Sequence, residues 1–130
     1  MEDIDDMQPM PTGELTLQTL AMPKDTNSNG DVFGGWLMSQ MDLAGAIAAR
    51  EVACGRVTTV AVGAMVFLTP VPVGATVSCH CTITEIGRSS VKVMIEVWLK
   101  QYDKNSRQKV TECEVVYVAI DGAGRTRPIN

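Results

Sequence analysis

The chain has 130 residues, of which 45% are hydrophobic and 20% are charged, so it is long enough for one domain with a substantial core. The formal net charge is −4 and no basic patch with interleaved aromatic side chains is present, which argues against a nucleic-acid-binding protein. A membrane span is not expected either, because the apolar run 32–49 is shorter than the roughly 20 residues required and contains Gly, Ser, Gln and Asp.

The first 13 residues are acidic, contain Pro9 and Pro11, and lack the basic start and apolar core of a secretion signal. We expect residues 1–13 to form a flexible N-terminal tail and the protein to be cytoplasmic. The four cysteines are then expected to be free thiols, since their spacing matches no disulfide or zinc framework. His80 stands between Cys79 and Cys81, but alternate residues of a strand face opposite sides, so no metal site is predicted.

The pattern of apolar and polar residues predicts five strands and one long helix. The strands are expected at residues 14–21, 57–68, 75–86, 91–102 and 109–120, with a polar tail after residue 123. Residues 57–68 are mostly apolar, as in an inner strand that is covered on both faces. The helix is expected to fade at residues 50–53, with Gly55 at the C′ position. Short turns between the last four strands favour a mostly antiparallel sheet, so the predicted class is a two-layer α+β domain.

The stretch 27–49, NSNGDVFGGWLMSQMDLAGAIAA, opens with turn residues, passes a glycine pair and continues as an apolar helix. Asp42 is the one charged residue of the apolar run. Burying a carboxylate without a partner is costly, so Asp42 has either a structural partner or a chemical role, and the residues alone leave both possibilities open. Gly34 and Gly35 stand where the helix should begin, and the unpaired N–H groups of a helix start could hold an oxyanion or a polarised carbonyl.

The spacing between the acid and the glycine pair constrains how they can cooperate. Asp42 follows Gly34 by eight residues and Gly35 by seven. In a helix this spacing is roughly 10–12 Å along the axis, which is too far for both to act on one small reacting group. If they act on the same carbonyl, Asp42 must come from a second copy of the chain. The spacing therefore predicts a homo-oligomer, a dimer at minimum, whose active site is shared between two subunits.

Three segments, LQTLAMPKDTNSNGDVFGGWLMSQMDLAGAIAAREVACGRV, FLTPVPVG and VKVMIEVWLK, resemble hotdog-fold acyl-CoA thioesterases, and most closely the YciA-type bacterial acyl-CoA hydrolases. The resemblance implies a hotdog fold at residues 14–124, in which a five- or six-stranded antiparallel sheet wraps one central helix, and a C-terminal tail at 125–130. It also implies an acyl-CoA substrate, dimers that pair through their sheets, and commonly a trimer of dimers. No cofactor is expected apart from coenzyme A as part of the substrate and product.

The resemblance also implies roles for individual residues. Asp42 matches the helix carboxylate that serves as general base or nucleophile. Asn27 matches a side chain in the preceding loop that orients the water or the substrate carbonyl. Gly34 and Gly35 match the helix start whose backbone N–H polarises the thioester carbonyl, and in the family the two parts of one site come from opposite subunits. Because a thioester has a good leaving group, a positioned water or nucleophile and an oxyanion site suffice for hydrolysis.

Coenzyme A carries phosphates, so an acidic protein must concentrate its few positive charges near the binding site. Arg88, Ser89 and Ser90 are expected at a tight turn with exposed N–H groups and hydroxyls, and the resemblance supports this turn as a CoA contact. Weaker candidates, each of which could equally be a solvated surface charge, are Arg56, Lys92, Arg125 and Arg127. The acyl chain is expected to lie against apolar residues that could equally be plain core, namely Trp36, Met41, Met65 and Phe67.

Two alternative functions are compatible with the same fold. A dehydratase acting on acyl thioesters typically relies on a His paired with Asp or Glu, and the predicted helix contains no His. A non-catalytic acyl-CoA binding protein would bind CoA esters without releasing a thiol. A Ser-His-Asp triad is disfavoured, because the chain lacks a G-x-S-x-G elbow and its one histidine, His80, is expected on a strand. Thioester hydrolysis is therefore the predicted reaction.

Overall fold

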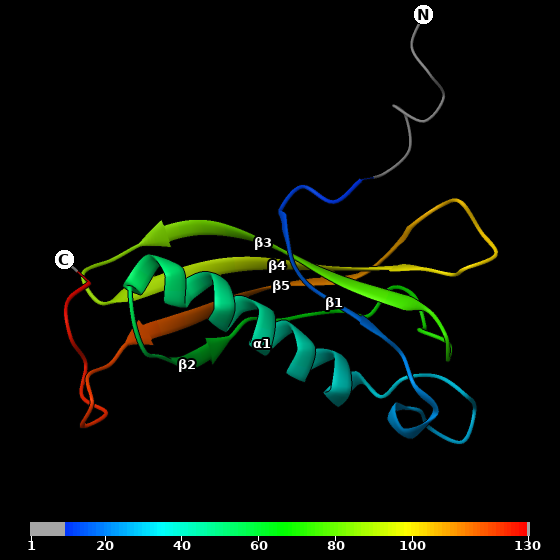
Figure 1. The fold of residues 1–130 in the computed structure, drawn as a ribbon, viewed down its shortest axis with the longest axis horizontal. Coiled ribbons are helices and arrows are strands. Elements are labelled where there is room, and N and C mark those ends of the chain that lie inside the picture. Colours follow the sequence, from blue (N-terminus) through cyan, green and yellow to red (C-terminus); the bar gives the residue numbers. More distant parts are fainter. Residues whose placement is uncertain (1–9, 130) are drawn as a thin grey trace, which may run out of the picture.

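The computed structural model describes residues 10–129, which form one long helix, a short 3-10 helix and a single sheet of five strands (Figure 1). The elements are β1 Glu14–Leu20, η2 Pro23–Asp25, α1 Gly34–Ala53, β2 Val57–Val62, β3 Thr76–Ile86, β4 Ser90–Lys100 and β5 Gln108–Ala119. Every strand pair is antiparallel, and the order across the sheet is β1-β3-β4-β5-β2. The predicted α+β class is thus confirmed, with five strands in the part of the chain that the structure describes.

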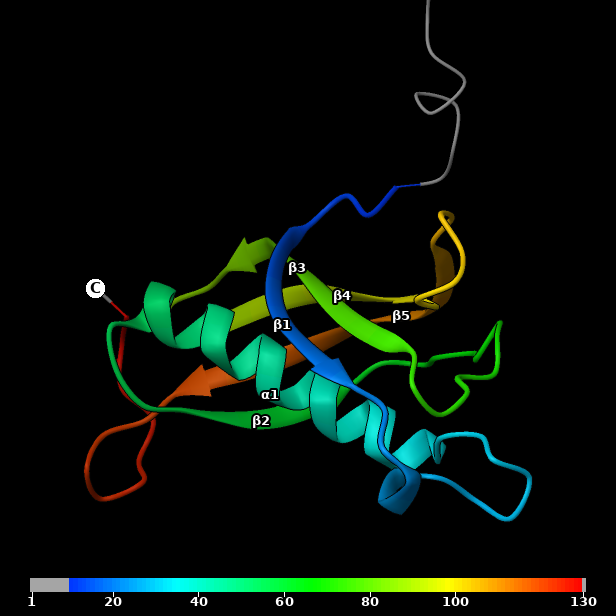
Figure 2. The same ribbon diagram turned by 45° about the vertical axis from the view of Figure 1, so that its right-hand side comes forward.

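Helix α1 lies across one face of the sheet, and the sheet curls around it (Figures 1 and 2). Strand β4 is central, and its helix-facing side chains are almost completely buried, namely Val91, Val93, Ile95, Val97 and Leu99. On the helix, the small residues Ala44, Gly45 and Ala49 are also buried, which lets the helix axis approach the sheet closely. The alternation predicted for β4 is therefore the alternation that builds the core.

Strand β2 differs from its prediction in both length and position. It ends at Val62 instead of residue 68, and it pairs only with β5, so it is an edge strand and not an inner one. Val60 and Val62 are about half exposed, and the apolar residues of the following segment 66–68 are 43–71% exposed. A continuous apolar run cannot distinguish a strand covered by its own chain from an edge strand that another subunit covers.

The helix ends at Ala53, within the predicted range, and Cys54 is the C-cap residue in the left-handed conformation (φ 53°), so Gly55 occupies the predicted C′ position. The side chain of Arg127 stabilises this end, because its Nη2 donates to the carbonyl of Ala53 at 2.9 Å and its Nε donates to Ile120 at 3.0 Å. A Cβ at Gly55 would lie 2.7 Å from Nη2 of Arg127. A side chain at this position would therefore displace the guanidinium from its contact with Ala53.

Both terminal segments contact the domain where the structure describes them. The backbone N–H and hydroxyl of Thr12 donate to Glu96 on β4, so residues 10–13 lie against the sheet, whereas residues 1–9 of the predicted N-terminal tail are outside the described part. Residues 125–129 return along the sheet, where Arg127 N–H donates to Ala119 and Ile129 N–H donates to Arg88. No helix in the described chain is both long and apolar enough to cross a bilayer.

The predicted placement of His80 and its two flanking cysteines on opposite faces of a strand is confirmed. Cys79 and Cys81 of β3 belong to the core, His80 faces the opposite side of the sheet, and all four cysteines are free thiols. Within residues 10–129, no group of three or more His, Cys, Asp or Glu side chains is arranged to hold a metal ion.

Candidate active site

Asp42 lies in the middle of α1, and its carboxylate is held by two hydroxyl groups. Oδ1 accepts a hydrogen bond from Thr59 on β2 at 2.6 Å, and the hydroxyl of Tyr117 on β5 lies 3.2 Å from the same oxygen and 2.9 Å from the Asp42 carbonyl. No Lys or Arg in the described chain forms an ion pair with this carboxylate. Asp42 therefore has structural partners, but they are neutral donors that leave its charge uncompensated.

The second carboxylate oxygen of Asp42 is left open by this arrangement. Oδ2 has no hydrogen-bond partner within residues 10–129, and Asp42 is only partly buried. No buried side-chain oxygen or nitrogen in the described chain lacks a partner, so Oδ2 must reach accessible surface. The carboxylate is thus oriented through one oxygen while the other can contact a water or a substrate.

Gly45 makes the Tyr117 contact possible. A Cβ at this position would overlap the hydroxyl of Tyr117 and would lie 2.7 Å from Cδ1 of Ile95. Glycine in a helix interior costs about 1 kcal/mol relative to alanine, so its presence here reflects the close approach of the tyrosine. Burial, followed by the negative charge of Asp42, raises the pKa of Tyr117 above its ordinary value, so the phenol stays protonated and remains a donor.

The start of α1 offers unpaired backbone donors. Phe33 occupies the N-cap position and provides no side-chain cap, while its carbonyl accepts the N–H groups of Trp36 and Leu37. The N–H groups of Gly34 and Gly35 have no backbone acceptor in the described chain. A Cβ at Gly35 would meet no atom within 4 Å, whereas one at Gly34 would lie 3.3 Å from the ring of Phe67. The glycine pair thus presents donors at an open surface.

Asn27 shapes the loop that precedes the helix. Its Oδ1 accepts the backbone N–H groups of Asn29 at 2.8 Å and Asp31 at 3.2 Å, and its own N–H donates to the Asp31 carbonyl. Because backbone N–H groups can only donate, the side-chain atom that faces them must be the oxygen. The amide nitrogen Nδ2 of Asn27 therefore points out of the loop and is the atom available to a ligand.

Two of the predicted CoA contacts are brought to the same end of the sheet. The carbonyl of Ser89 accepts the N–H of Ala119, and the carbonyl of Arg56 accepts the N–H of Ile120, the next residue along the chain. Arg88 is exposed and forms no ion pair in the described chain, and Ser90 closes the turn by accepting the N–H of Gly87. The turn at 88–90 and Arg56 are therefore neighbours.

The other basic candidates have partners or stand apart. Lys92 forms an ion pair with Glu85 at 3.3 Å. Arg127 is engaged at the end of α1, as described above, and the exposed Arg125 uses its backbone N–H to close the turn at Asp121. Arg56 itself donates weakly to the carbonyls of Asp121 and Gly122, at 3.4 and 3.5 Å. The guanidinium groups of Arg88 and Arg125 thus have no competing contact in the described chain, and of these two only Arg88 belongs to the turn 88–90.

The predicted acyl-pocket residues do not form one group. Met41 is 1% exposed and belongs to the core between helix and sheet, which is the alternative that the sequence left open. Trp36 and Met65 are partly buried at the border of this core. Phe67 is 43% exposed and packs over Gly34, so it lies at the helix start together with Trp36, which belongs to the first turn of α1.

Three residues around Asp42 were missed from the sequence, namely Gly45, Thr59 and Tyr117. Gly45 carried a signal, because an isolated glycine in a helix interior often marks a close approach. Thr59 and Tyr117 carried none, since a polar residue in an otherwise apolar strand has no assigned partner until the strands are placed.

Comparison with known proteins connects this geometry to a group of enzymes. A family model described as the thioesterase superfamily matches residues 29–104. The acyl-CoA thioester hydrolase YciA of Salmonella typhimurium is 52% identical over 126 residues, which cover 95% of this chain and 95% of that protein. The crystal structure of a hexameric thioesterase from Yersinia pestis has a TM-score of 0.89 at 54% identity, covering 93% of this chain and 98% of that one. A hexameric hotdog-fold thioesterase of Campylobacter jejuni has a TM-score of 0.84 at 41% identity, with 91% of each chain covered.

Proposed function

Because the chain belongs to the thioesterase superfamily and has its hotdog fold, we propose that it is an acyl-CoA hydrolase that converts acyl-CoA to a free fatty acid and coenzyme A. The observation that carries this proposal is the half-buried carboxylate of Asp42, which two neutral hydroxyls orient and no cation within residues 10–129 neutralises. The only cofactor-like group in this scheme is the coenzyme A of the substrate and product, and no metal takes part.

Asp42 acts in this scheme as the general base or as the nucleophile. Thr59 and Tyr117 hold Oδ1, so the accessible Oδ2 is the atom that takes a proton from water or attacks the thioester carbon. As the tetrahedral intermediate forms, negative charge develops on the carbonyl oxygen, and the C–S bond then breaks to release CoA thiolate. Preorganised donors at the oxyanion lower the barrier most effectively when they are already in place.

The donors proposed for the oxyanion are the N–H groups at the start of α1. The helix is continuous from Gly34 to Ala53, so Gly34 and Asp42 of one chain are about 12 Å apart along its axis. A thioester carbonyl cannot reach both, and the scheme therefore joins Asp42 of one subunit to Gly34 and Gly35 of a second subunit. Asn27, whose Nδ2 is free to donate, is proposed to orient the water or the substrate carbonyl at the same site.

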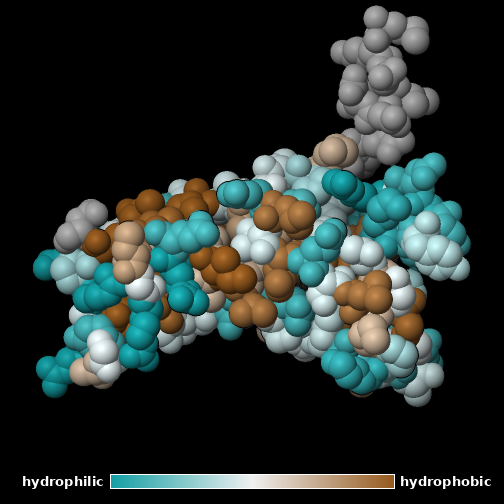
Figure 3. Space-filling model, in the orientation of Figure 1, coloured by the Kyte–Doolittle hydropathy of each residue, from teal (hydrophilic) through white to brown (hydrophobic). Residues whose placement is uncertain are grey.

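The surface of the single chain supports such a pairing. Apolar patches lie exposed on the side of the molecule that α1 occupies (Figure 3). Phe33, Met38 and Leu43 of the helix region and Val60 and Val62 of the edge strand are each more than 40% exposed. Exposed apolar surface next to an unpaired strand edge is typical of a subunit interface. We therefore propose a homo-oligomer built from dimers, and, from the hexameric relatives, a trimer of dimers.

Coenzyme A is proposed to bind at the turn 88–90, with Arg88 as the principal phosphate contact and Arg56 beside it. Lys92 joins this group only if its ion pair with Glu85 opens. A guanidinium and adjacent hydroxyls can form charge-assisted hydrogen bonds with a pyrophosphate. This turn lies near the C-terminal end of α1, whereas the glycine pair of the same chain lies at the start of the helix.

The test is release of free thiol from a series of acyl-CoA chain lengths by purified Asp42→Asn, with Glu51→Gln as the control. Glu51 is an exposed carboxylate of the same helix, so its substitution changes the same charge away from the site. We expect kcat to fall about 100-fold or more in Asp42→Asn, while Glu51→Gln keeps full activity. Wild-type turnover in a folded Asp42→Asn oligomer would falsify the role of Asp42. A wild-type protein that binds acyl-CoA but releases no thiol would instead indicate a binding protein.

A dehydratase is disfavoured by the position of the one histidine. His80 lies on the outer face of β3, on the opposite side of the sheet from α1 and Asp42, so the two cannot form a catalytic pair within one chain. Incubation with an enoyl-CoA and detection of the hydrated product distinguishes this activity from hydrolysis directly.

A further inference from the structure

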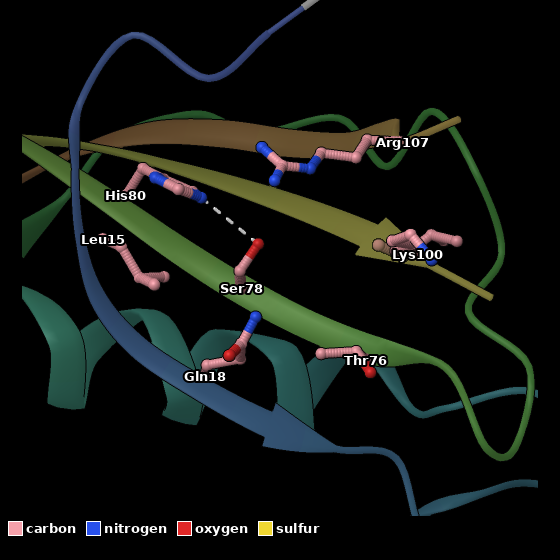
Figure 4. Close-up of a pocket in the computed structure, with 8 residues that line it drawn as sticks. Leu15, Gln18, Thr76, Ser78, His80, Lys100 and Arg107 are labelled. Atoms are coloured by element: carbon pink, nitrogen blue, oxygen red, sulfur yellow. Dashed lines mark hydrogen bonds between the residues drawn. The ribbon is translucent and has the colours of Figure 1, made fainter. Parts of the chain in front are cut away.

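A cavity with a volume of about 340 Å³ lies on the outer face of the sheet, away from α1 (Figure 4). Its floor is formed by outward-facing residues of β3, since Val77 and Cys79 point into the core and the residues between them point out. Six of its eight lining residues are polar or charged, namely Gln18, Thr76, Ser78, His80, Lys100 and Arg107. The cavity is therefore separate from Asp42 and is built for a polar ligand.

The charge in this cavity is positive. Lys100 at the end of β4 and Arg107 just before β5 both line it, and among the described residues no Asp or Glu does. Neither cation forms an ion pair within residues 10–129, although the net charge of the protein is −4. Arg107 extends its guanidinium across the cavity toward His80 (Figure 4). Two uncompensated cations in one hollow of an acidic protein form a local field that attracts anions.

The polar groups around these cations have fixed orientations. Nδ1 of His80 lies 3.2 Å from the carbonyl of Gly13, which can only accept, so Nδ1 carries a proton. In the neutral imidazole, Nε2 then accepts from the hydroxyl of Ser78 at 3.2 Å. Gln18 and Ser78 are register partners on β1 and β3, and Thr76 is the register partner of Lys100. The side chains of Gln18 and Thr76 thus add hydrogen-bond donors beside the two cations.

We propose that this outer cavity is a binding site for the phosphate group of a small phosphorylated metabolite. Arg107 supplies a planar fork that matches phosphate oxygens, Lys100 supplies a point charge, and Gln18 and Thr76 supply neutral donors. The volume lies at the lower end of the range for small-molecule sites, which suits a phosphomonoester and not a large polyanion. The phosphate belongs to a free metabolite, because coenzyme A is proposed to bind at the turn 88–90, at the opposite end of β4 from Lys100.

The single histidine of the chain makes this site directly observable. In protein labelled with ¹³C at histidine Cε1, the one histidine signal is followed by NMR while inorganic phosphate is titrated at constant pH and ionic strength. We expect a saturable shift in the wild-type oligomer and a much smaller shift with acetate, which carries one charge. The phosphate dissociation constant should rise about tenfold or more in the Arg107→Gln variant and in the Lys100→Gln/Arg107→Gln double variant, because charge-assisted hydrogen bonds are lost.

Lys104→Gln is the matched control, because Lys104 is an exposed cation of the same β4–β5 loop but does not line the cavity. It should bind phosphate as the wild type does. A histidine signal that does not saturate, or one that responds equally in the Arg107→Gln variant, overturns the proposal. Parallel titrations with adenosine 3′,5′-bisphosphate and with a small sugar phosphate identify the source of the phosphate. The proposal does not depend on the hydrolase activity, so an inactive but phosphate-binding protein would leave it standing.

Discussion

The hydroxyl of Thr59 lies 2.6 Å from Oδ1 of Asp42, and this contact joins the edge strand β2 to the middle of α1. A hydrogen bond from a hydroxyl to a carboxylate is short and strong compared with one between neutral groups. Its effect is to fix the direction of the carboxylate, so that Oδ2 is the oxygen presented to the surface. The edge strand is thus part of the proposed catalytic apparatus as well as of the sheet.

Replacing Thr59 by valine keeps the shape of the side chain and removes the donor. We expect kcat for thioester hydrolysis to fall about ten- to a hundredfold with little change in KM, because a hydrogen bond to a charged group contributes about 1.5–3 kcal/mol. Steady-state thiol release at several acyl-CoA concentrations measures both parameters. Thr59→Ser retains the hydroxyl and should stay near wild type, and an unchanged kcat in Thr59→Val would show that Asp42 needs no such orientation.

Gly45 and Tyr117 are expected to be energetically coupled. Gly45→Ala would force a methyl group onto the Tyr117 hydroxyl, and overpacking of this kind costs about 1–3 kcal/mol. In the Tyr117→Phe background the hydroxyl is absent, so the same alanine should cost less, although Ile95 still crowds the site. Chemical denaturation of the wild type, both single variants and the double variant gives the coupling free energy. Simple additivity of the two effects would contradict the packing seen here.

The stabilising contribution of Glu96 to the fold should be lost in acid. Burial alone would raise its pKa, but hydrogen bonds from Thr12 and Trp98 and the charge of Lys109 outweigh this, so the pKa of Glu96 is lower than its ordinary value of 4.5. A carboxyl whose pKa is depressed by folding stabilises the fold above its unfolded pKa and loses that contribution as the pH falls through the folded pKa. The free energy of unfolding should therefore decrease below about pH 4.5.

The variant Glu96→Gln isolates this contribution, since an amide can still accept from Thr12 but does not titrate. Its melting temperature should depend less steeply on pH than that of the wild type between pH 5 and about pH 3. Glu112→Gln is the control, because Glu112 is more exposed and shares the same Lys109 partner. Parallel pH profiles for wild type and Glu96→Gln would rule out the depressed pKa.

The cysteines should differ sharply in reactivity. Burial, followed by the charge of Cys81, raises the pKa of Cys79 to about 12, and burial also raises the pKa values of the Cys81 and Cys113 thiols. Cys54 is exposed at the end of α1. An aromatic disulfide reagent should therefore titrate one thiol per native chain and four per denatured chain, and Cys54→Ser should remove the fast one. Two or more fast thiols in the native protein would contradict the buried placement of Cys79, Cys81 and Cys113.

The helix, its glycine start and its buried acid could be predicted because each is a local pattern. The apolar run, the turn residues before it and the lone carboxylate all lie within residues 27–49. Alternation likewise predicted the core face of β4, since side-chain direction in a strand follows from sequence position alone. These features needed no knowledge of which strands are neighbours.

What the sequence did not predict depends on contacts between distant segments. The apolar run 57–68 was predicted to be an inner strand, but the chain leaves the sheet at Val62 and pairs with β5 alone. Arg127 has the charge expected of a phosphate ligand, but its guanidinium donates hydrogen bonds to the carbonyls of Ala53 and Ile120. The role of Thr59 was missed for the same reason, because its partner Asp42 is 17 positions away and on a different element. Partners of this kind follow from topology and not from composition.

The proposal that one active site uses two chains can be tested by mixing inactive subunits. Asp42→Ala lacks the carboxylate, and Gly35→Pro lacks one N–H at the helix start, where proline fits because the first turn needs no such donor and the space around Gly35 is open. A mixed dimer of the two variants has one site with both defects and one site with neither. Random pairing should therefore restore about a quarter of wild-type activity, since half of the dimers are mixed and each has one intact site.

Each variant must be inactive when assayed alone, and Gly35→Ala is the control because it keeps the N–H and meets no neighbouring atom. Co-expression of the two variants with different affinity tags, followed by tandem purification, isolates the mixed assemblies for the thiol-release assay, and removal of the homodimers should raise the recovered activity from about a quarter to about half of wild type. If a site were complete within one chain, every site in the mixture would contain a defect and no activity would return. Recovery therefore depends on the axial distance between Gly35 and Asp42, which no movement within a continuous helix can close.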